Sequence, residues 1–166
     1  MRDTYLVKSK EEDILDCLSG NSVPASAEGL FQPLPAAVPL TTAELQQISP
    51  TALAYLGDAV YELYVRSHYL LPPKRSQTYH RLVVAQVRAE TQARQLQSLT
   101  PHLNNTELEI VRRGRNASLG RPRRVEPEIY QQATSLETLI GYLYLTDSQR
   151  LTQLLQKLKL ELNPQE

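Results

Sequence analysis

Two carboxylates in the middle of the chain lie in helix-forming stretches and are spaced to act together. Residues 51–62 repeat apolar side chains at helical spacing, which predicts a buried stripe formed by Leu53, Leu56, Val60 and Leu63. Asp58 projects from the side opposite this stripe, and Glu62 follows one helical turn later on the same side. This pattern predicts two carboxylates that line a cleft away from the core.

Gly57 directly precedes the first of these acids and is an unexpected residue inside a helix. Glycine costs about 1 kcal/mol of helix propensity relative to alanine. Such a cost is more easily understood if another backbone or a ligand must approach the helix at this point.

A third acid, Glu137, lies at the edge of another apolar stripe, which is formed by Ile129, Leu136, Ile140 and Leu143. Small residues lie one turn to either side of it, Ala133 before and Gly141 after. Its carboxylate therefore emerges on a face free of bulky side chains, as close helix packing or metal binding requires. Spacing alone leaves two interpretations open: Asp58 and Glu137 form a metal-binding pair, or both are ordinary solvated acids on helix flanks.

Basic side chains are concentrated in the middle of the chain, although the formal net charge is +0. Residues 1–50 contain three basic and seven acidic side chains, a net charge of −4. Residues 66–124 contain twelve basic and three acidic side chains, a net charge of +9. Such a segment favours nucleic acid as a partner, and a solvated helix surface is the alternative.

Part of this charge lies in a predicted basic loop of thirteen residues without an acid, which contains Arg112, Arg113, Arg115, Arg121, Arg123 and Arg124. With Asn116 as a further polar contact, this loop is suited to hold phosphates on both sides of a groove. Such contacts would hold the backbone of a nucleic acid and would not read its base sequence. A disordered basic loop is the alternative.

Capping and breaking signals predict the all-α domain that must position these residues. Thr41 with Glu44 forms a capping box before a short helix, and Ser49 followed by Pro50 starts a long one. Further helices are predicted over residues 76–99, 106–113, 127–145 and 148–162, with Ser76, the capping box of Thr106 and Glu109, and Asp147 as start signals and Gly114 as a stop signal. No segment alternates with a period of two residues, so we expect no sheet.

The length of 166 residues and the 41% apolar content suit one packed domain. Residues 1–40 are rich in proline and small residues and predict a flexible or loosely packed extension, which leaves residues 41–166 as the domain. The lone Cys17 can close no intrachain disulfide, and no segment has the character of a secretory signal or a membrane span. We therefore expect a cytoplasmic protein.

Three ordered motifs resemble the ribonuclease III family. Leu56-Gly57-Asp58-Ala59-Val60 is similar to the signature helix of that family, and Glu137-Thr-Leu-Ile-Gly141 is similar to its second acidic motif. The stretch Arg112-Arg-Gly-Arg-Asn-Ala117, together with Tyr61-Glu62, narrows the resemblance to the short, single-domain members.

The resemblance implies a magnesium-dependent endoribonuclease that cleaves double-stranded RNA, with Asp58 and Glu137 holding Mg²⁺ over the scissile phosphate. Glu62 is then a candidate for the outer coordination sphere of the ion. The resemblance further implies a homodimer packed through the signature helices, and precursor ribosomal RNA of the large (23S) subunit as substrate. A large-subunit ribosomal protein is a candidate partner that presents this RNA.

The match has departures. Ala54, Thr51 and Thr134 occupy positions at which longer family members carry acids, so this chain has a reduced set of anionic ligands. Little sequence follows the predicted last helix, so no appended double-stranded-RNA-binding domain is expected.

Mg²⁺ prefers oxygen ligands and keeps several waters, so two carboxylates and a substrate phosphate suffice for a site. No Ser, Cys or His nucleophile is then needed, and the three histidines, His68, His80 and His102, show no metal-ligand spacing. Two alternatives to the enzyme remain: a catalytically silent RNA-binding or ribosome-associated module with the same fold, and a helical protein-interaction domain.

Overall fold

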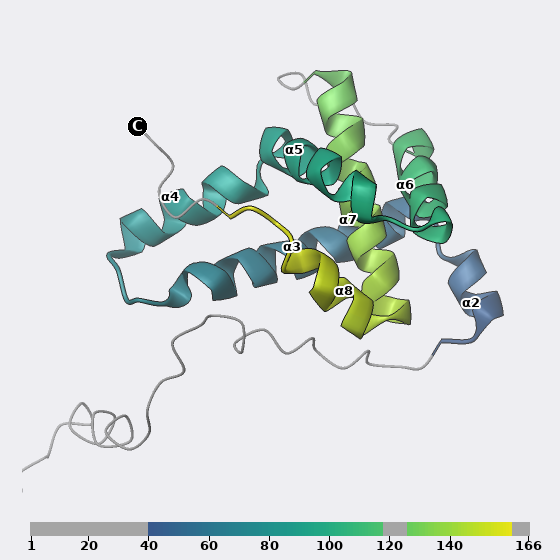
Figure 1. The fold of residues 1–166 in the computed structure, drawn as a ribbon, viewed down its shortest axis with the longest axis horizontal. Coiled ribbons are helices and arrows are strands. Elements are labelled where there is room, and N and C mark those ends of the chain that lie inside the picture. The colour runs from purple at the N-terminus through teal and green to yellow at the C-terminus, as the bar shows by residue number, and fades with distance from the viewer. Residues whose placement is uncertain (1–39, 118–125, 161–166) are drawn as a thin grey trace, which may run out of the picture.

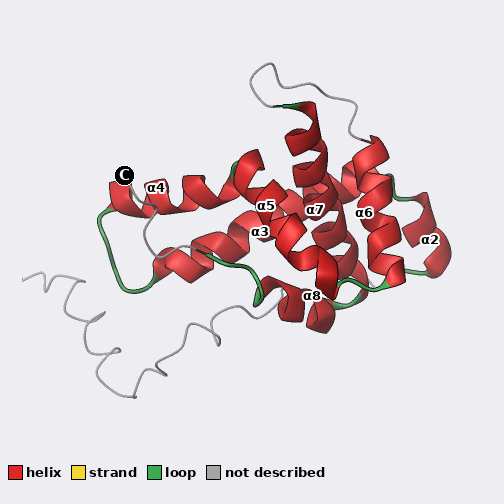
Figure 2. Cartoon of the chain, turned by 45° about the horizontal axis from the view of Figure 1, so that its top comes forward, coloured by secondary structure: helices red, strands yellow, loops and turns green. Residues whose placement is uncertain are grey.

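The computed structural model describes residues 40–117 and 126–160, and within them every regular element is a helix (Figure 2). The elements in chain order are α2 (Thr42–Gln47), α3 (Pro50–Leu70), α4 (Ser76–Val87), α5 (Ala89–Leu99), the 3₁₀ helix η2 (Thr100–His102), α6 (Asn105–Ala117), α7 (Pro127–Thr146) and α8 (Ser148–Leu155). The expectation of an all-α fold is confirmed. None of the helices in the described part of the chain is long and apolar enough to cross a membrane.

Helix α7 is the central element, because it packs against α3, α5, α6 and α8. Figures 1 and 2 show it crossing α3 at a steep angle, while α4 runs back beside the C-terminal part of α3. From residue 133 to residue 141, every residue of α7 is buried except Glu137, which is half-buried. The core around it includes the fully buried side chains of Tyr61, Val65, Val83, Leu136, Leu139, Leu151 and Leu155.

Three helix starts lie where the sequence predicts them. Thr41 and Glu44 make the reciprocal hydrogen bonds of a capping box before α2. Ser49 accepts a hydrogen bond from the backbone N–H of Ala52, with Pro50 in the first turn of α3. Asp147 caps α8 in the same way through Arg150. Each cap satisfies a backbone donor that has no partner within the helix, which is why these signals are readable locally.

The single helix predicted over residues 76–99 is wrong, because the chain breaks at Arg88 into α4 and α5. Arg88 has an extended backbone, with φ −72° and ψ 150°, and the hydroxyl of Thr91 donates to the carbonyl of Ala85 across the break at 2.8 Å. Ser76 does not cap α4, whose N-cap residue is Arg75 without a side-chain hydrogen bond. The break lets α4 pack against α3 and α5 pack against α7, which one straight helix would not do.

The predicted start and end of the next helix are also wrong. Asn104 and Glu107, not Thr106 and Glu109, form the capping box of α6, because each donates a backbone N–H to the side chain of the other at 2.9 Å. Gly114 does not end this helix, which continues to Ala117. A Cβ atom at Gly114 would lie 2.5 Å from Oγ1 of Thr138, so this glycine serves close packing of α6 on α7.

The last helix ends at Leu155, earlier than predicted. Beyond it, the side-chain amide of Gln95 donates to the Lys159 carbonyl at 2.8 Å and accepts from the Lys159 N–H at 3.2 Å. These two bonds satisfy the backbone of Lys159 in a non-helical conformation and attach it to α5.

Candidate active site

Helices α3 and α7 meet backbone to backbone at Gly57 and Gly141. A Cβ atom on Gly57 would lie 1.8 Å from the carbonyl oxygen of Glu137, and one on Gly141 would lie 2.0 Å from that of Leu53. Both distances are far shorter than van der Waals contact, so only glycine allows this approach. The expectation that a backbone or a ligand approaches Gly57 is confirmed, and the approaching group is the backbone of α7.

This crossing changes which side of α3 faces the core. Leu53 and Val60 are buried as expected, but Leu63 is 40% exposed. The buried face also includes Ala54, Gly57, Tyr61, Val65 and Tyr69. Close backbone contact requires small side chains, so Ala54 and Gly57 turn toward α7 and the predicted leucine stripe is partly displaced. As a result Asp58 lies beside the buried face and not opposite it.

The crossing brings Asp58 and Glu137 into electrostatic contact. Burial raises the pKa of the Glu137 carboxyl to about 7, and the charge of Asp58 adds to the rise. Asp58 is exposed, but desolvation of its carboxyl group still raises its pKa, and the charge of Glu62 adds to the rise. Two acids with raised pKa values at one place are destabilised when both are ionised, which is what a cation would relieve.

Glu62 lies one turn from Asp58, but its carboxylate is engaged elsewhere. Its Oε1 accepts hydrogen bonds from Nε of Arg66 at 3.1 Å and from Nη2 at 2.5 Å. Within residues 40–117 and 126–160, no three His, Cys, Asp or Glu side chains form a cluster that could hold a metal. The donor set therefore consists of two carboxylates, which fits a hard cation such as Mg²⁺ that keeps most of its water ligands.

A third polar group at the crossing, Gln92, was missed by the sequence analysis. Its side chain reaches from α5 close enough to both carboxylates to lower the pKa of Asp58 and of Glu137, opposing the larger effect of burial. Gln92 is only 2% exposed, and its Nε2 atom has no hydrogen-bond partner of normal geometry. The available signal was a glutamine at a position where the helical pattern of α5 calls for a buried residue.

Comparison with known proteins assigns this arrangement to a family. The Ribonuclease III domain model matches residues 51–148, which include Asp58, Gln92 and Glu137. The chain belongs to the ribonuclease III family.

Relatives confirm the narrower resemblance to the short members. A Mini-ribonuclease 3 from Synechocystis is 57% identical over 122 residues, which cover 74% of this chain and 85% of the relative. One from Synechococcus is 60% identical over 119 residues, covering 72% and 86%. A crystal structure of a Fusobacterium nucleatum protein superposes with a TM-score of 0.62 at 30% identity, over 66% of this chain and 91% of that protein.

The chain is thus an endoribonuclease of a family that acts on double-stranded RNA. Membership of the ribonuclease III family supports the enzyme over a silent RNA-binding module or a protein-interaction domain.

Only some of the arginines predicted to bind RNA lie in the part of the chain that the structure describes. Arg112, Arg113, Arg115 and Asn116 lie in α6, so this half of the predicted loop is helical. Arg112 pairs with Glu109 at 2.6 Å, and Arg115 lies 3.9 Å from Glu128. Arg121, Arg123 and Arg124 lie outside the described residues.

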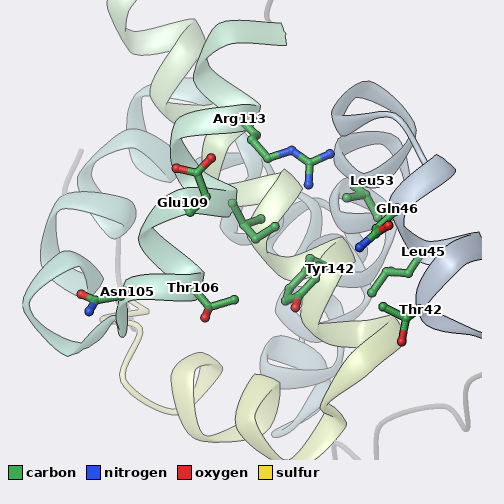
Figure 3. Close-up of a pocket in the computed structure, with 10 residues that line it drawn as sticks. Thr42, Leu45, Gln46, Leu53, Asn105, Thr106, Glu109, Arg113 and Tyr142 are labelled. Atoms are coloured by element: carbon green, nitrogen blue, oxygen red, sulfur yellow. The ribbon is translucent and has the colours of Figure 1, made fainter.

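Arg113 also lines a pocket of about 490 Å³ between α2, α3, α6 and α7. Figure 3 shows its guanidinium extending over this pocket toward Gln46 and Leu53, with Glu109 on the neighbouring turn. Neither Asp58 nor Glu137 lines the pocket, so it is separate from the two carboxylates.

Proposed function

We propose that this endoribonuclease cleaves double-stranded RNA in a reaction that depends on Mg²⁺ bound by Asp58 and Glu137. The observation that carries the proposal is the glycine crossing of α3 and α7, at which two acids some eighty residues apart in sequence interact. Two like-charged carboxylates, of which Glu137 is half-buried, are a costly arrangement for a fold and a useful one for binding a cation.

The protein contributes position, charge and desolvation to this chemistry. Asp58 and Glu137 supply the two anionic oxygens, and the backbone contact beneath them holds their helices at a constant separation. When bound, Mg²⁺ supplies a water of lowered pKa and neutralises charge developing on the phosphate. Glu62 is proposed as an outer acid, which the hydrogen bonds to Arg66 hold in place.

RNA binding is assigned to the basic residues of α6 and of the segment after it. Arg112, Arg113, Arg115, Asn116, Arg121, Arg123 and Arg124 are proposed to contact phosphates and sugars and not base edges. The catalytic unit is proposed to be residues 41–166, without contribution from residues 1–40.

A homodimer is proposed to place two active sites on one duplex, so that both strands are cut. Tyr55 is 85% exposed and Leu63 40% exposed, and with the exposed Leu70 they share one face of α3. The exposed Glu62–Arg66 ion pair lies on the same face, and this mixture of apolar and charged side chains suits an isologous helix pair. Sedimentation at micromolar concentration should give twice the monomer mass of 18.8 kDa. Leu63→Glu should dissociate the dimer, whereas Val84→Glu, at an equally exposed position on α4, should not.

Precursor large-subunit ribosomal RNA is the proposed natural substrate, with the cytoplasm as location and a ribosomal protein as candidate partner. The support is the resemblance to the short family members. A duplex copied from the 23S precursor stalk should be cut at defined positions and faster than an unrelated duplex of the same length.

The decisive experiment compares the natural protein with Asp58→Asn on a generic RNA duplex, with and without Mg²⁺. The substitution keeps the side-chain volume and removes the charge, so turnover should fall by about a thousandfold, as when a group stabilising the transition state is lost. Duplex binding should largely survive, because other residues carry it. Full cleavage by folded Asp58→Asn protein, or by natural protein in chelator, would contradict the proposal.

A further inference from the structure

Gln92 is the polar side chain whose environment the proposed reaction does not yet explain. It projects from α5, the helix that packs on α7, and lies in the interior with 2% of its surface exposed. Its Nε2 atom is buried without a hydrogen-bond partner of normal geometry. Burying an amide N–H without a partner destabilises a fold, so a reason for this residue is needed.

The neighbours of Gln92 supply the reason. Its side chain interacts with both Asp58 and Glu137, which come from two different helices. A primary amide carries two N–H donors on one nitrogen, and each of the two ionised carboxylates is an acceptor with no proton of its own. One amide can therefore serve both acids at once.

The chemistry of the residue type also fits. A lysine or arginine in this place would bring a positive charge and compete with a cation for the two carboxylates. A glutamine donates hydrogen bonds without net charge, so it can orient the acids and leave their charge available to a metal.

The two other buried glutamines of the same region have different environments. Gln95 is satisfied at both side-chain atoms by the backbone of Lys159, which is a structural role. Gln86 is 3% exposed and has an unpartnered Oε1 atom, but it is not among the groups that shift the pKa of Asp58 or of Glu137. Gln86 is therefore a matched control for the burial of a glutamine away from the site.

We propose that Gln92 is a positioning residue, whose amide N–H groups donate to Asp58 and Glu137 and hold the two carboxylates in the arrangement that binds a shared divalent cation. This inference rests on the proposed function of the two acids. This role gives the buried, unpartnered Nε2 of Gln92 a function as a hydrogen-bond donor.

The test measures Mn²⁺ affinity by electron paramagnetic resonance on the full chain without RNA, so that it does not depend on turnover. Gln92→Met keeps the side-chain volume and removes both donors, and should weaken Mn²⁺ binding by about ten- to a hundredfold, as expected for a group that orients metal ligands. Gln86→Met should bind Mn²⁺ like the natural protein. Circular dichroism melting establishes that each variant is folded.

A second substitution separates a donor from a metal ligand. Gln92→Glu is equal in size and cannot donate when ionised, so it should also bind Mn²⁺ more weakly than the natural protein. Tighter binding by Gln92→Glu would overturn the proposal, because position 92 would then contribute an oxygen ligand. If Gln92→Met does not fold, the Mn²⁺ affinity of Gln92→Glu still tests the proposal.

Kinetics supply an independent reading. Gln92→Met should lower kcat with an unchanged KM for duplex RNA, and higher Mg²⁺ should restore part of the loss. The role of Gln92 would be overturned if folded Gln92→Met bound Mn²⁺ as tightly as the wild-type protein. It would also be overturned if Gln86→Met lost as much Mn²⁺ affinity as Gln92→Met. Asp58→Asn shows which of the two proposals has failed. If both Asp58→Asn and Gln92→Met keep the Mn²⁺ affinity of the wild-type protein, the proposed metal site is wrong. If Asp58→Asn loses Mn²⁺ binding and Gln92→Met keeps it, only the role of Gln92 is wrong.

Discussion

Glu107 and Glu137 are both shielded from water, yet their carboxylates are in opposite electrostatic environments. Glu107 is 2% exposed and accepts hydrogen bonds from Arg150 at 2.7 Å and 2.9 Å. The hydrogen bond with Arg150 lowers the pKa of Glu107 despite its burial. Glu137 is less buried, but burial and the charge of Asp58 raise its pKa to about 7.

The difference separates a structural acid from a functional one. Arg150 also donates to the His102 carbonyl at 2.7 Å, so the Glu107 pair connects the start of α6, the end of η2 and α8 with its charge satisfied. Glu137 has no comparable cationic partner in the part of the chain that the structure describes, and only the neutral Gln92 opposes the rise of its pKa. Burial alone therefore does not identify a site, whereas burial without charge compensation does.

The largest effect is expected from a substitution that disrupts the close crossing of α3 and α7, which places Glu137 beside Asp58. Gly57→Ala places a Cβ atom against the backbone of α7, which cannot move aside as a side chain can. We expect a loss of about 3 kcal/mol or more in the free energy of unfolding, at the upper end for overpacking, together with loss of Mn²⁺ binding. Urea denaturation and Mn²⁺ titration measure the two quantities.

Gly114→Ala is the matched control, because its added Cβ would meet mainly the Thr138 side chain. It should cost less stability and leave Mn²⁺ binding intact. Equal losses for the two glycine variants would mean that the α3 and α7 crossing has no special role.

The next largest effects are expected when Glu107 and Glu137 are each replaced by the neutral glutamine. Glu107→Gln leaves Arg150 partly buried without its counter-charge and should lower the free energy of unfolding by about 2 kcal/mol. Cleavage per folded molecule should be retained. Glu137→Gln removes a repulsion, so its unfolding free energy at pH 8 should equal or slightly exceed that of the natural protein while cleavage is lost. A large destabilisation by Glu137→Gln would make Glu137 a structural acid.

The pH dependence of stability should differ in sign for the two acids. The pKa of Glu107 is lowered in the fold, so its contribution is present above the unfolded value near 4.5 and is lost as pH falls through the folded value. The pKa of Glu137 is raised to about 7, so its contribution is present below about 4.5 and is lost as pH rises to about 7. Metal-free natural protein should therefore lose stability relative to Glu137→Gln between these pH values, as thermal melts in chelator would measure.

The smallest effect concerns charge that lies outside the catalytic pair. Replacing Arg112, Arg113 and Arg115 with alanine should weaken binding of unrelated duplexes to a similar extent. The slope of log affinity against log salt should fall by about one for each arginine that contacts a phosphate. Arg112 is already paired with Glu109, so its share should be the smallest. An unchanged salt slope in the triple variant would assign RNA binding to another surface.

Local signals in the sequence were sufficient for much of the fold. Thr41, Ser49 and Asp147 cap their helices as predicted, because a cap is made by a side chain and a backbone donor only a few residues apart. The two acids and the glycines beside them were also identified from their spacing, and the family that their motifs resemble was confirmed.

Only tertiary packing decided which face of α3 is buried, where the chain breaks at Arg88 and which of two neighbouring capping boxes starts α6. In each case the local sequence favours two alternatives almost equally, and the contact with α7 selects one of them. Gln92 is the clearest case, because a glutamine in a helix is ordinary in sequence. Its meaning arises only when α3, α5 and α7 bring it beside two carboxylates that are distant along the chain.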